Sequence, residues 1–279
     1  MIHYQDCILV TDMDGTLLNS NSKISEKNCK AIEFFKGNGG KFAIATGRTE
    51  KSVATFFKQA KPNAPCIFYN GAVLYDWDEQ KFLKTQNVKS KELIEFLKDC
   101  MEIYPTLCIR VYTTDKNYII TGEKSLNRFV VGSTMEFIFA DLSEVLNKSW
   151  LKVLLAEERD ILETCKAKLN KYHLEDTTNH FFSNDYYFEF VDKGVSKGAM
   201  VKMMKSLNEF EGKIVFATGD FHNDIEMLQV ADVGIAPANA EPEVKAVADM
   251  ISVTNDNDLI HQIIYHIIPD YFNKRMKGQ

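Results

Sequence analysis

Short apolar runs alternate with amphipathic stretches along the first part of the chain. Buried strands are predicted at three runs, Cys7–Thr11, Phe42–Ala45 and Cys66–Tyr69. Helices are expected between them, one capped by Ser25 and one beginning near Thr49. This alternation is typical of a parallel sheet with helices on both faces.

The pattern changes between about Trp77 and Gly194. A helix followed by two adjacent strands occurs twice, with the helices predicted at Ser90–Met101 and Asp160–Tyr172. The paired strands are predicted at Cys108–Thr113, Tyr118–Thr121, His180–Ser183 and Tyr186–Val191. A separate strand is expected at Trp150–Leu155 and a helical stretch near Leu126–Phe129. Antiparallel pairs with helices on one side are typical of an α+β layer.

After Gly194 the first pattern resumes. Helices are predicted at Lys197–Leu207 and Asp224–Val230, strands at Lys213–Ala217 and Val233–Ala236, and a last helix at Asp258–Ile268, ending at Pro269. The predicted fold class is therefore α/β, with a parallel-sheet core built from both ends of the chain. The domains are predicted as a core of residues 1–80 and 190–279 and an insert of residues 81–189.

Composition excludes several classes of protein. The 279 residues carry 39 acidic and 33 basic side chains, a net charge of -6, which argues against a nucleic-acid partner. No apolar run is long enough to span a membrane, and the N-terminus lacks the features of a cleaved signal. The six cysteines are isolated, which is typical of reduced core residues. We expect a cytoplasmic protein without a membrane partner, as a monomer or small homo-oligomer.

Polar residues collect where the predicted core strands end. The three segments are Asp12–Thr16, Thr46–Arg48 and Thr218–Asp224. Because the carboxyl ends of parallel strands face one crevice, they should bring four carboxylates and a hydroxyl together. Negative charge at that density is costly without a cation, and a set of hard oxygen ligands suits Mg²⁺. The sequence therefore predicts a magnesium site at this edge of the sheet.

Each segment also has a purely structural alternative. The sequence Asp-x-Asp-Gly around Asp12 and the sequence Thr-Gly-Arg after it are common turns, and Asp224 could be only a helix N-cap. Lys197 could be a solvated surface lysine. Its position near the start of a helix opposes the helix dipole, however, so a nearby anion would explain it better.

The combination of segments, in this order, resembles the Cof-like branch of the haloacid dehalogenase (HAD) superfamily of phosphatases. The segments that carry the resemblance are Asp12–Leu18, Ala45–Arg48, Asn70–Ala72, Gly194–Gly198 and Gly219–Asp224, and it spans essentially the whole chain. The resemblance implies a Rossmann-like parallel-sheet core and identifies the insert as an α+β cap domain. In such enzymes the cap closes over the substrate and selects it.

Carried over to this chain, the resemblance implies hydrolysis of a phosphate ester. Asp12 would attack phosphorus and become an aspartyl-phosphate, while Asp14 would first protonate the leaving oxygen and then deprotonate water. Mg²⁺ would be held by the Asp12 carboxylate, the Asp14 backbone carbonyl and Asp220, with Asp224 orienting a metal water or Lys197. The groups implied for the phosphoryl oxygens and the substrate are Thr46, the backbone N–H groups of Met13 and Gly47, Lys197, Asn223, Asn70 and Arg48.

Three positions are left open by the resemblance. Pro237 stands where the branch usually has an unrestricted residue, and its fixed φ and missing N–H change the loop after the predicted strand. Arg48 could bind substrate or brace the cap. His222 could reach the site, although an exposed loop histidine is the simpler interpretation.

The predicted function is a Mg²⁺-dependent phosphatase of small phosphorylated metabolites. Sugar phosphates are the first expectation, followed by cofactors such as flavin mononucleotide (FMN) or pyridoxal phosphate (PLP). The alternatives are a phosphomutase of the same superfamily, a catalytically silent metabolite-binding protein on the same scaffold, and a receiver-type regulatory domain. Receiver domains are about half this length and carry no such insert, so the last alternative fits poorly.

Overall fold

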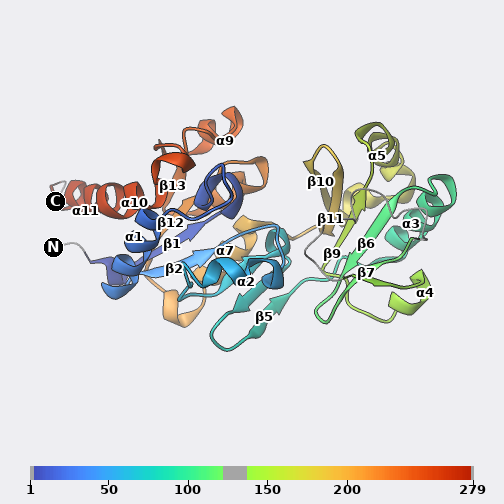
Figure 1. Cartoon of the computed structure of the whole chain (residues 1–279), viewed down its shortest axis with the longest axis horizontal. Coiled ribbons are helices and arrows are strands. Elements are labelled where there is room, and N and C mark those ends of the chain that lie inside the picture. The colour runs from blue at the N-terminus through green and yellow to red at the C-terminus, as the bar shows by residue number, and fades with distance from the viewer. Residues whose placement is uncertain (1–2, 122–136, 278–279) are drawn as a thin grey trace. The chain divides into compact units, whose positions relative to one another are not determined.

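The computed structural model of the chain describes residues 3–121 and 137–277, which form two compact units (Figure 1). The first unit, called the core, joins Met1–Lys84 to Ser196–Gln279, and the second, called the cap, is Thr85–Val195. The helical stretch predicted near Leu126–Phe129 lies outside the described residues. Within the described ranges, the helices are too short or too polar to cross a membrane.

The core is built on a five-stranded parallel sheet in the order β14-β13-β12-β1-β2. Its strands are β1 (Cys7–Thr11), β2 (Lys41–Ile44), β12 (Ile214–Thr218), β13 (Val233–Ala236) and β14 (Met250–Ile251). Strand β1 is buried along its whole length, as expected for a strand covered on both faces. At its end Thr11 pairs with Thr218 of β12 and Ile44 of β2, so three strand ends lie at one edge. The predicted α/β class is confirmed.

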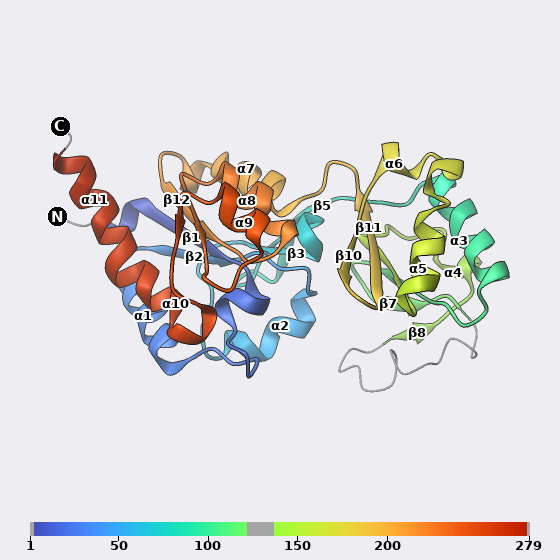
Figure 2. The same cartoon turned by 90° about the horizontal axis from the view of Figure 1, so that it is seen from above.

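Helices cover both faces of this sheet. They are α1 (Glu26–Gly37), α2 (Glu50–Phe57), α7 (Lys197–Lys205), α8 (Ile225–Val230), α9 (Pro242–Val247), α10 (Leu259–Gln262) and α11 (Ile268–Lys277). Residues from α7, α8 and α9 bury one face against Ile8 and Val10, while α1 and α10 lie on the opposite side (Figure 2). The side chains of Ser25, Thr49 and Ser196 cap α1, α2 and α7 by accepting backbone N–H bonds.

The third predicted strand does not belong to the parallel core sheet, as the sequence pattern had indicated, but to a second sheet. Strand β3 (Cys66–Phe68) meets the parallel sheet through a single bridge between Ala45 and Ile67. It then continues into a separate three-stranded sheet with β4 (Val73–Asp76) and β5 (Lys81–Thr85), where β3 and β4 are antiparallel. The chain reverses because Tyr69 and Asn70 both adopt left-handed backbone angles, a conformation that apolar periodicity does not reveal.

The prediction that the last helix ends at Pro269 was wrong. After α10, the backbone makes one wider helical turn over Ile263–Ile267 and then continues as α11 through Pro269. In the wide turn the N–H of Ile268 bonds to the carbonyl of Ile263, five residues back. A turn of this kind changes the position of the preceding carbonyls, which is how a helix accommodates the pyrrolidine ring.

The cap contains a six-stranded sheet in the order β10-β11-β9-β6-β7-β8. Its strands are β6 (Cys108–Tyr112), β7 (Asn117–Ile119), β8 (Ile138–Phe139), β9 (Lys152–Ala156), β10 (Thr178–Asn184) and β11 (Tyr187–Asp192). All neighbours are antiparallel except β7 and β8. In the described part of the cap, the helices that accompany the sheet are α3 (Lys91–Ile103), α4 (Leu142–Val145), α5 (Arg159–Lys166) and α6 (Leu174–Thr177).

Helix α5 ends earlier than predicted. It stops at Lys166, and a short 3₁₀ turn over Leu169–Tyr172 follows it. Leu162, Cys165 and Leu169 all join the apolar core of the cap. The apolar spacing therefore continues past the helix end, which explains why the sequence pattern indicated one longer helix.

The two faces of the cap sheet have different chemistry. Ile109, Val153 and Phe188 belong to the apolar core that the cap helices share. Because side chains alternate along a strand, Lys152 and Glu189 lie on the other face. Both are buried, and they form an ion pair with 2.9 Å between Nζ and Oε2.

Candidate active site

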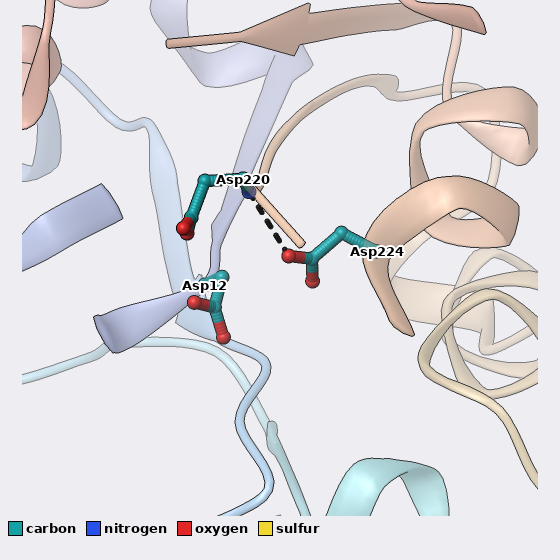
Figure 3. A group of neighbouring side chains, drawn as sticks. All are labelled: Asp12, Asp220 and Asp224. Carbon is teal, nitrogen blue, oxygen red and sulfur yellow. Dashed lines mark hydrogen bonds between the residues drawn. The ribbon is translucent and has the colours of Figure 1, made fainter. Parts of the chain in front are cut away.

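Three aspartates converge at the carboxyl edge of the core sheet. Asp12 follows β1 directly, Asp220 comes two residues after β12, and Asp224 lies in the turn before α8. Figure 3 shows their side chains pointing toward one another, and one carboxylate oxygen from each lies within 4.8 Å of the others. The backbone N–H of Asp12 donates to the carbonyl of Thr218 at 2.8 Å, which joins the two strand ends.

Lys197 lies buried against two of these carboxylates. It is the first residue of α7, only 1% exposed, and its Nζ donates to Oδ1 of Asp12 at 2.5 Å and to Oδ1 of Asp224 at 2.6 Å. Burial alone would lower the pKa of Lys197, but the carboxylates of Asp12 and Asp224 raise it above its ordinary value. The structure therefore excludes a solvated surface position for Lys197, and the ammonium is held in its charged form.

Asp224 orients the other groups of the cluster. Its Oδ1 accepts from Lys197, and its Oδ2 accepts from the backbone N–H groups of Asp220 at 3.0 Å and Phe221 at 3.1 Å. These bonds lead back into the loop after β12, and the side chain makes no capping bond to α8. Both oxygens of Asp224 are therefore engaged, so its contacts fix the loop and the lysine.

The remaining oxygens fit a divalent cation. Among the described residues, Oδ2 of Asp12 and Oδ2 of Asp220 accept no hydrogen bond. Burial raises the pKa of Asp12; Lys197 opposes this effect, and the nearby Asp224 and Asp220 add to it. Burial also raises the pKa of Asp220 to about 6, against the hydrogen bond from Thr16. Three carboxylates face one ammonium, and this surplus of negative charge on hard oxygen atoms suits Mg²⁺.

Asp14 lies outside this cluster. Its side chain is 57% exposed. The guanidinium of Arg48 donates to it twice, from Nε to Oδ2 at 2.8 Å and from Nη2 to Oδ1 at 2.5 Å. The expectation that four carboxylates gather in one place therefore holds for three of them. The fourth carboxylate, that of Asp14, pairs with the side chain of Arg48, which follows β2 in the sequence.

A second group of predicted residues meets beside the strand ends. Thr46 is buried after β2, and its hydroxyl accepts the backbone N–H of Arg48 at 3.2 Å. Asn223 donates from Nδ2 to Oδ1 of Asn70 at 3.0 Å. A Cβ atom on Gly47 would lie 2.8 Å from the same Asn70 oxygen, so a larger residue at position 47 would displace the Asn70 side chain. These four residues therefore come together from the loops after β2, β3 and β12.

The remaining candidate positions contribute through backbone or lie apart. The side chain of Met13 is fully buried, so only its backbone can face a ligand. His222 is largely exposed, with Nε2 3.8 Å from Oε2 of Glu243. The loop that carries Pro237 still reaches the segment after β1, because Nδ2 of Asn239 donates to the carbonyl of Gly15 at 2.8 Å.

Two residues that shape the site, Thr16 and Asn239, were assigned no role from the sequence. The hydroxyl of Thr16 donates to Oδ1 of Asp220 at 2.6 Å and so orients that carboxylate. Gly15 has a φ of +76°, and a Cβ atom there would lie 2.3 Å from Oδ2 of Asp220. The hydroxyl close after the paired aspartates was a usable signal for Thr16. The contact of Asn239 has no local signal, because its partner is 224 residues away.

Comparisons with known proteins agree with this geometry. A family model described as haloacid dehalogenase-like hydrolase matches residues 9–264. The chain is 24% identical over 252 residues to the 5-amino-6-(5-phospho-D-ribitylamino)uracil phosphatase YitU of Bacillus subtilis strain 168, covering 90% of this chain and 93% of that protein. It is 25% identical to the pyridoxal phosphate phosphatase YbhA of Escherichia coli K12, covering 94% and 98% of the two chains.

A solved structure shares the whole fold. The crystal structure of a haloacid dehalogenase-like hydrolase from Bacteroides thetaiotaomicron superposes with a TM-score of 0.79 at 25% identity, covering 93% of this chain and 98% of that one. The family match extends over both segments of the core and over the cap between them. The chain is therefore an enzyme that belongs to the haloacid dehalogenase-like hydrolase family, as its motifs had indicated.

Proposed function

We propose that this hydrolase is a Mg²⁺-dependent phosphatase of small phosphorylated metabolites that works through an aspartyl-phosphate on Asp12. The observation that carries the proposal is the contact of Lys197 with Asp12 beside Asp220. A buried carboxylate with one oxygen held by a fixed ammonium and the other without a hydrogen-bond donor is suited to nucleophilic attack. Lys197, together with a bound cation, would supply the positive charge that a phosphoryl group needs.

In the first step a carboxylate oxygen of Asp12 attacks phosphorus, and the bond from phosphorus to the ester oxygen breaks. The departing oxygen takes a proton from the carboxyl group of Asp14, whose side chain is 57% exposed. The products of this step are an alcohol and an acyl phosphate on Asp12. Lys197 offsets negative charge on the aspartate and the phosphoryl oxygens as they approach each other.

In the second step Asp14, now a carboxylate, takes a proton from water. The water oxygen attacks phosphorus, and the bond from phosphorus to the Asp12 oxygen breaks. Inorganic phosphate leaves, Asp12 returns as a carboxylate and Asp14 is again protonated. The same side chain therefore serves as acid and then as base.

Mg²⁺ would be held by Asp12, Asp220 and the backbone carbonyl of Asp14, and when bound it supplies positive charge at the phosphoryl oxygens. We assign the other phosphoryl contacts to Lys197, the hydroxyl of Thr46 and the backbone N–H groups of Met13 and Gly47. Asn223 and Asn70 stand beside Gly47 and shape this part of the pocket.

Two relatives support the class of substrate. They are named as phosphatases of 5-amino-6-(5-phospho-D-ribitylamino)uracil and of pyridoxal phosphate, both of which are small phosphorylated metabolites. We propose the same class for this chain, with sugar phosphates tested first and phosphorylated cofactors such as FMN and PLP second. A cytoplasmic location agrees with substrates of this kind.

The test is a screen for phosphate release across a broad panel of phosphorylated metabolites, with Mg²⁺ and with a chelator. The proposal predicts Mg²⁺-dependent release from at least one ester, and Asp12→Asn should abolish it. An isomeric product without free phosphate would instead identify a phosphomutase. Ligand binding without turnover of any ester would identify a binding protein on the same scaffold.

A further inference from the structure

Arg48 is fixed at several points within the core. Its backbone N–H donates to the hydroxyl of Thr46 at 3.2 Å, and its carbonyl accepts the backbone N–H of Tyr69 at 3.1 Å. Its guanidinium lies over the ring of Phe56 on α2, with 5.3 Å from Cζ to the ring centre. Both the backbone and the side chain of this arginine are therefore held before it meets any ligand.

The held guanidinium presents two N–H groups to a single carboxylate. Nε and Nη2 of Arg48 reach the two oxygens of Asp14, one each. Such a fork fixes the plane of a carboxylate as well as its distance, which a single ammonium cannot do. Asp14 is 57% exposed and accepts no other side-chain bond among the described residues, so Arg48 alone restricts its side chain.

From this contact we propose that Arg48 is a positioning residue for Asp14, which goes beyond and rests on the proposed phosphatase function. The arginine holds the Asp14 carboxyl group at the place where it exchanges a proton with the leaving oxygen. This assignment differs from direct binding of substrate and from bracing of the cap. It also connects the acid to the loop of Thr46, because Arg48 bonds to both.

The proposal makes a prediction that depends on the leaving group. An alkyl alcohol must receive a proton as it leaves, whereas 4-nitrophenol leaves as a phenolate without one. Loss of a positioned acid therefore slows alkyl esters much more than 4-nitrophenyl phosphate. Loss of a phosphate contact, or of local stability, slows both esters by the same factor. The ratio of the two kcat/KM values separates these roles.

The experiment compares Arg48→Met with wild type in the full-length chain with Mg²⁺, using 4-nitrophenyl phosphate and the best alkyl phosphate from the screen. A positioned acid contributes about 10²–10⁴-fold, so we expect kcat/KM for the alkyl ester to fall about 10- to 100-fold. The loss for 4-nitrophenyl phosphate should be at least about tenfold smaller, which also shows that the variant folds. An equal loss on both esters would overturn the proposal.

Arg159→Met is the matched control. Arg159 also pairs with a carboxylate, that of Glu163, and its guanidinium also lies over a ring, that of Phe182 at 3.5 Å. It belongs to α5 of the cap and is no part of the proposed machinery. We expect this variant to leave the alkyl-to-aryl ratio unchanged, and a shift as large as that of Arg48→Met would contradict the assignment.

Two further variants test whether Arg48 acts through Asp14. In an Asp14→Asn background, Arg48→Met should cost the alkyl ester no more than about twofold, since residues that act as a unit are not additive. Arg48→Lys restores the charge without the fork and should remain impaired on the alkyl ester. Full additivity, or full rescue by lysine, would overturn the proposal. If wild type releases phosphate from no ester, the proposed function fails instead.

Discussion

Each unit of the chain buries a lysine against carboxylates, and the two lysines have different surroundings. In the cap, the described residues pair Lys152 with Glu189, whose second oxygen accepts the hydroxyl of Ser183 at 2.7 Å. In the core, Lys197 meets two carboxylates, and a third lies within 4.8 Å of them. Among the described residues, the cap contact is a pair of one cation and one anion, whereas the core cluster carries more negative than positive charge.

Under the proposed function, the difference separates a structural ion pair from a catalytic one. Both carboxylate oxygens of Glu189 have partners, and Nζ of Lys152 also lies 4.9 Å from the ring centre of Tyr112. Asp12 and Asp220 each keep one oxygen without a hydrogen bond from the described residues. A buried charge without an opposite charge beside it destabilises the fold. Such a charge is therefore typical of a site where a bound ligand supplies the opposite charge. A buried lysine alone therefore does not indicate a site, but a surplus of unsatisfied carboxylate does.

The largest effect is expected from removing Asp12, the proposed nucleophile. Asp12→Asn should lower phosphate release from every ester by about 10⁴-fold or more, because loss of a covalent nucleophile affects all substrates alike. Glu189→Gln, the corresponding carboxylate-to-amide change in the cap, should leave kcat/KM within about threefold of wild type. Phosphate release measures both. If Asp12→Asn kept most of its activity, the comparison between the two lysines would lose its basis.

The next effect concerns stability of the cap. Lys152→Met removes the ammonium that the described residues pair with buried Glu189, and breaking such a pair typically costs about 3–5 kcal/mol. Replacing both residues by methionine should recover most of the lost stability. A buried ion pair can often be replaced by apolar side chains of similar volume without a loss of stability. The measurement is urea unfolding followed by Trp150 fluorescence in a Trp77→Phe background, because Trp150 is buried in the cap. A double variant no more stable than Lys152→Met would show that the pair is not a balanced structural unit.

A third prediction concerns the divalent cation. Mg²⁺ at about 100 times its Kd should stabilise wild type by about 2.7 kcal/mol, seen as a rise in Tm. Asp220→Asn should remove this rise, because it replaces a charged ligand oxygen by a neutral group. Glu189→Gln should keep it. An equal Mg²⁺-dependent rise in Asp220→Asn would place the cation elsewhere.

The smallest effect is expected from an exposed ion pair of the cap. Burial alone would raise the pKa of Asp115, but hydrogen bonds from Thr113 and Lys148 and the charge of Lys148 lower it to about 2. Since the pKa is lower in the folded state, the pair stabilises the cap at neutral pH. That contribution is lost as the pH falls from about 4 toward 2.

Solvent exposure of Asp115 keeps this contribution below about 1 kcal/mol. Asp115→Asn should therefore destabilise the cap slightly at pH 7 and leave it unchanged near pH 2, in unfolding curves followed by Trp150. A difference that grows as the pH falls would reverse the sign of the argument.

The sequence predicts best what local pattern encodes. The buried strand Cys7–Thr11 and the cap of α1 by Ser25 occur as expected, because apolar runs and N-cap residues act over a few positions. The antiparallel hairpin after β3 was missed, since its turn depends on the left-handed angles of Tyr69 and Asn70. The continuation of α11 through Pro269 was missed because a wide helical turn has no apolar signature.

The candidate site was predictable to the extent that motifs lie at strand ends. Asp12 and Asp220 meet because the parallel strands β1 and β12 deliver their carboxyl ends to one edge. Lys197 reaches Asp12 from the start of α7. The fork from Arg48 to Asp14 joins residues 34 positions apart and could not be inferred, since either residue could have faced solvent. The pair of Lys152 and Glu189 was likewise hidden, because pairing across strands depends on register.

The central claim is that Asp12 becomes covalently phosphorylated during turnover, and trapping of the intermediate tests it most directly. The enzyme is mixed with its best ester and Mg²⁺, quenched in acid, and treated with borohydride, which reduces an aspartyl-phosphate to homoserine. Peptide mass spectrometry should then find homoserine at position 12 in wild type and not in Asp12→Asn. Turnover with an unmodified Asp12, or with the modification at another residue, would contradict the account.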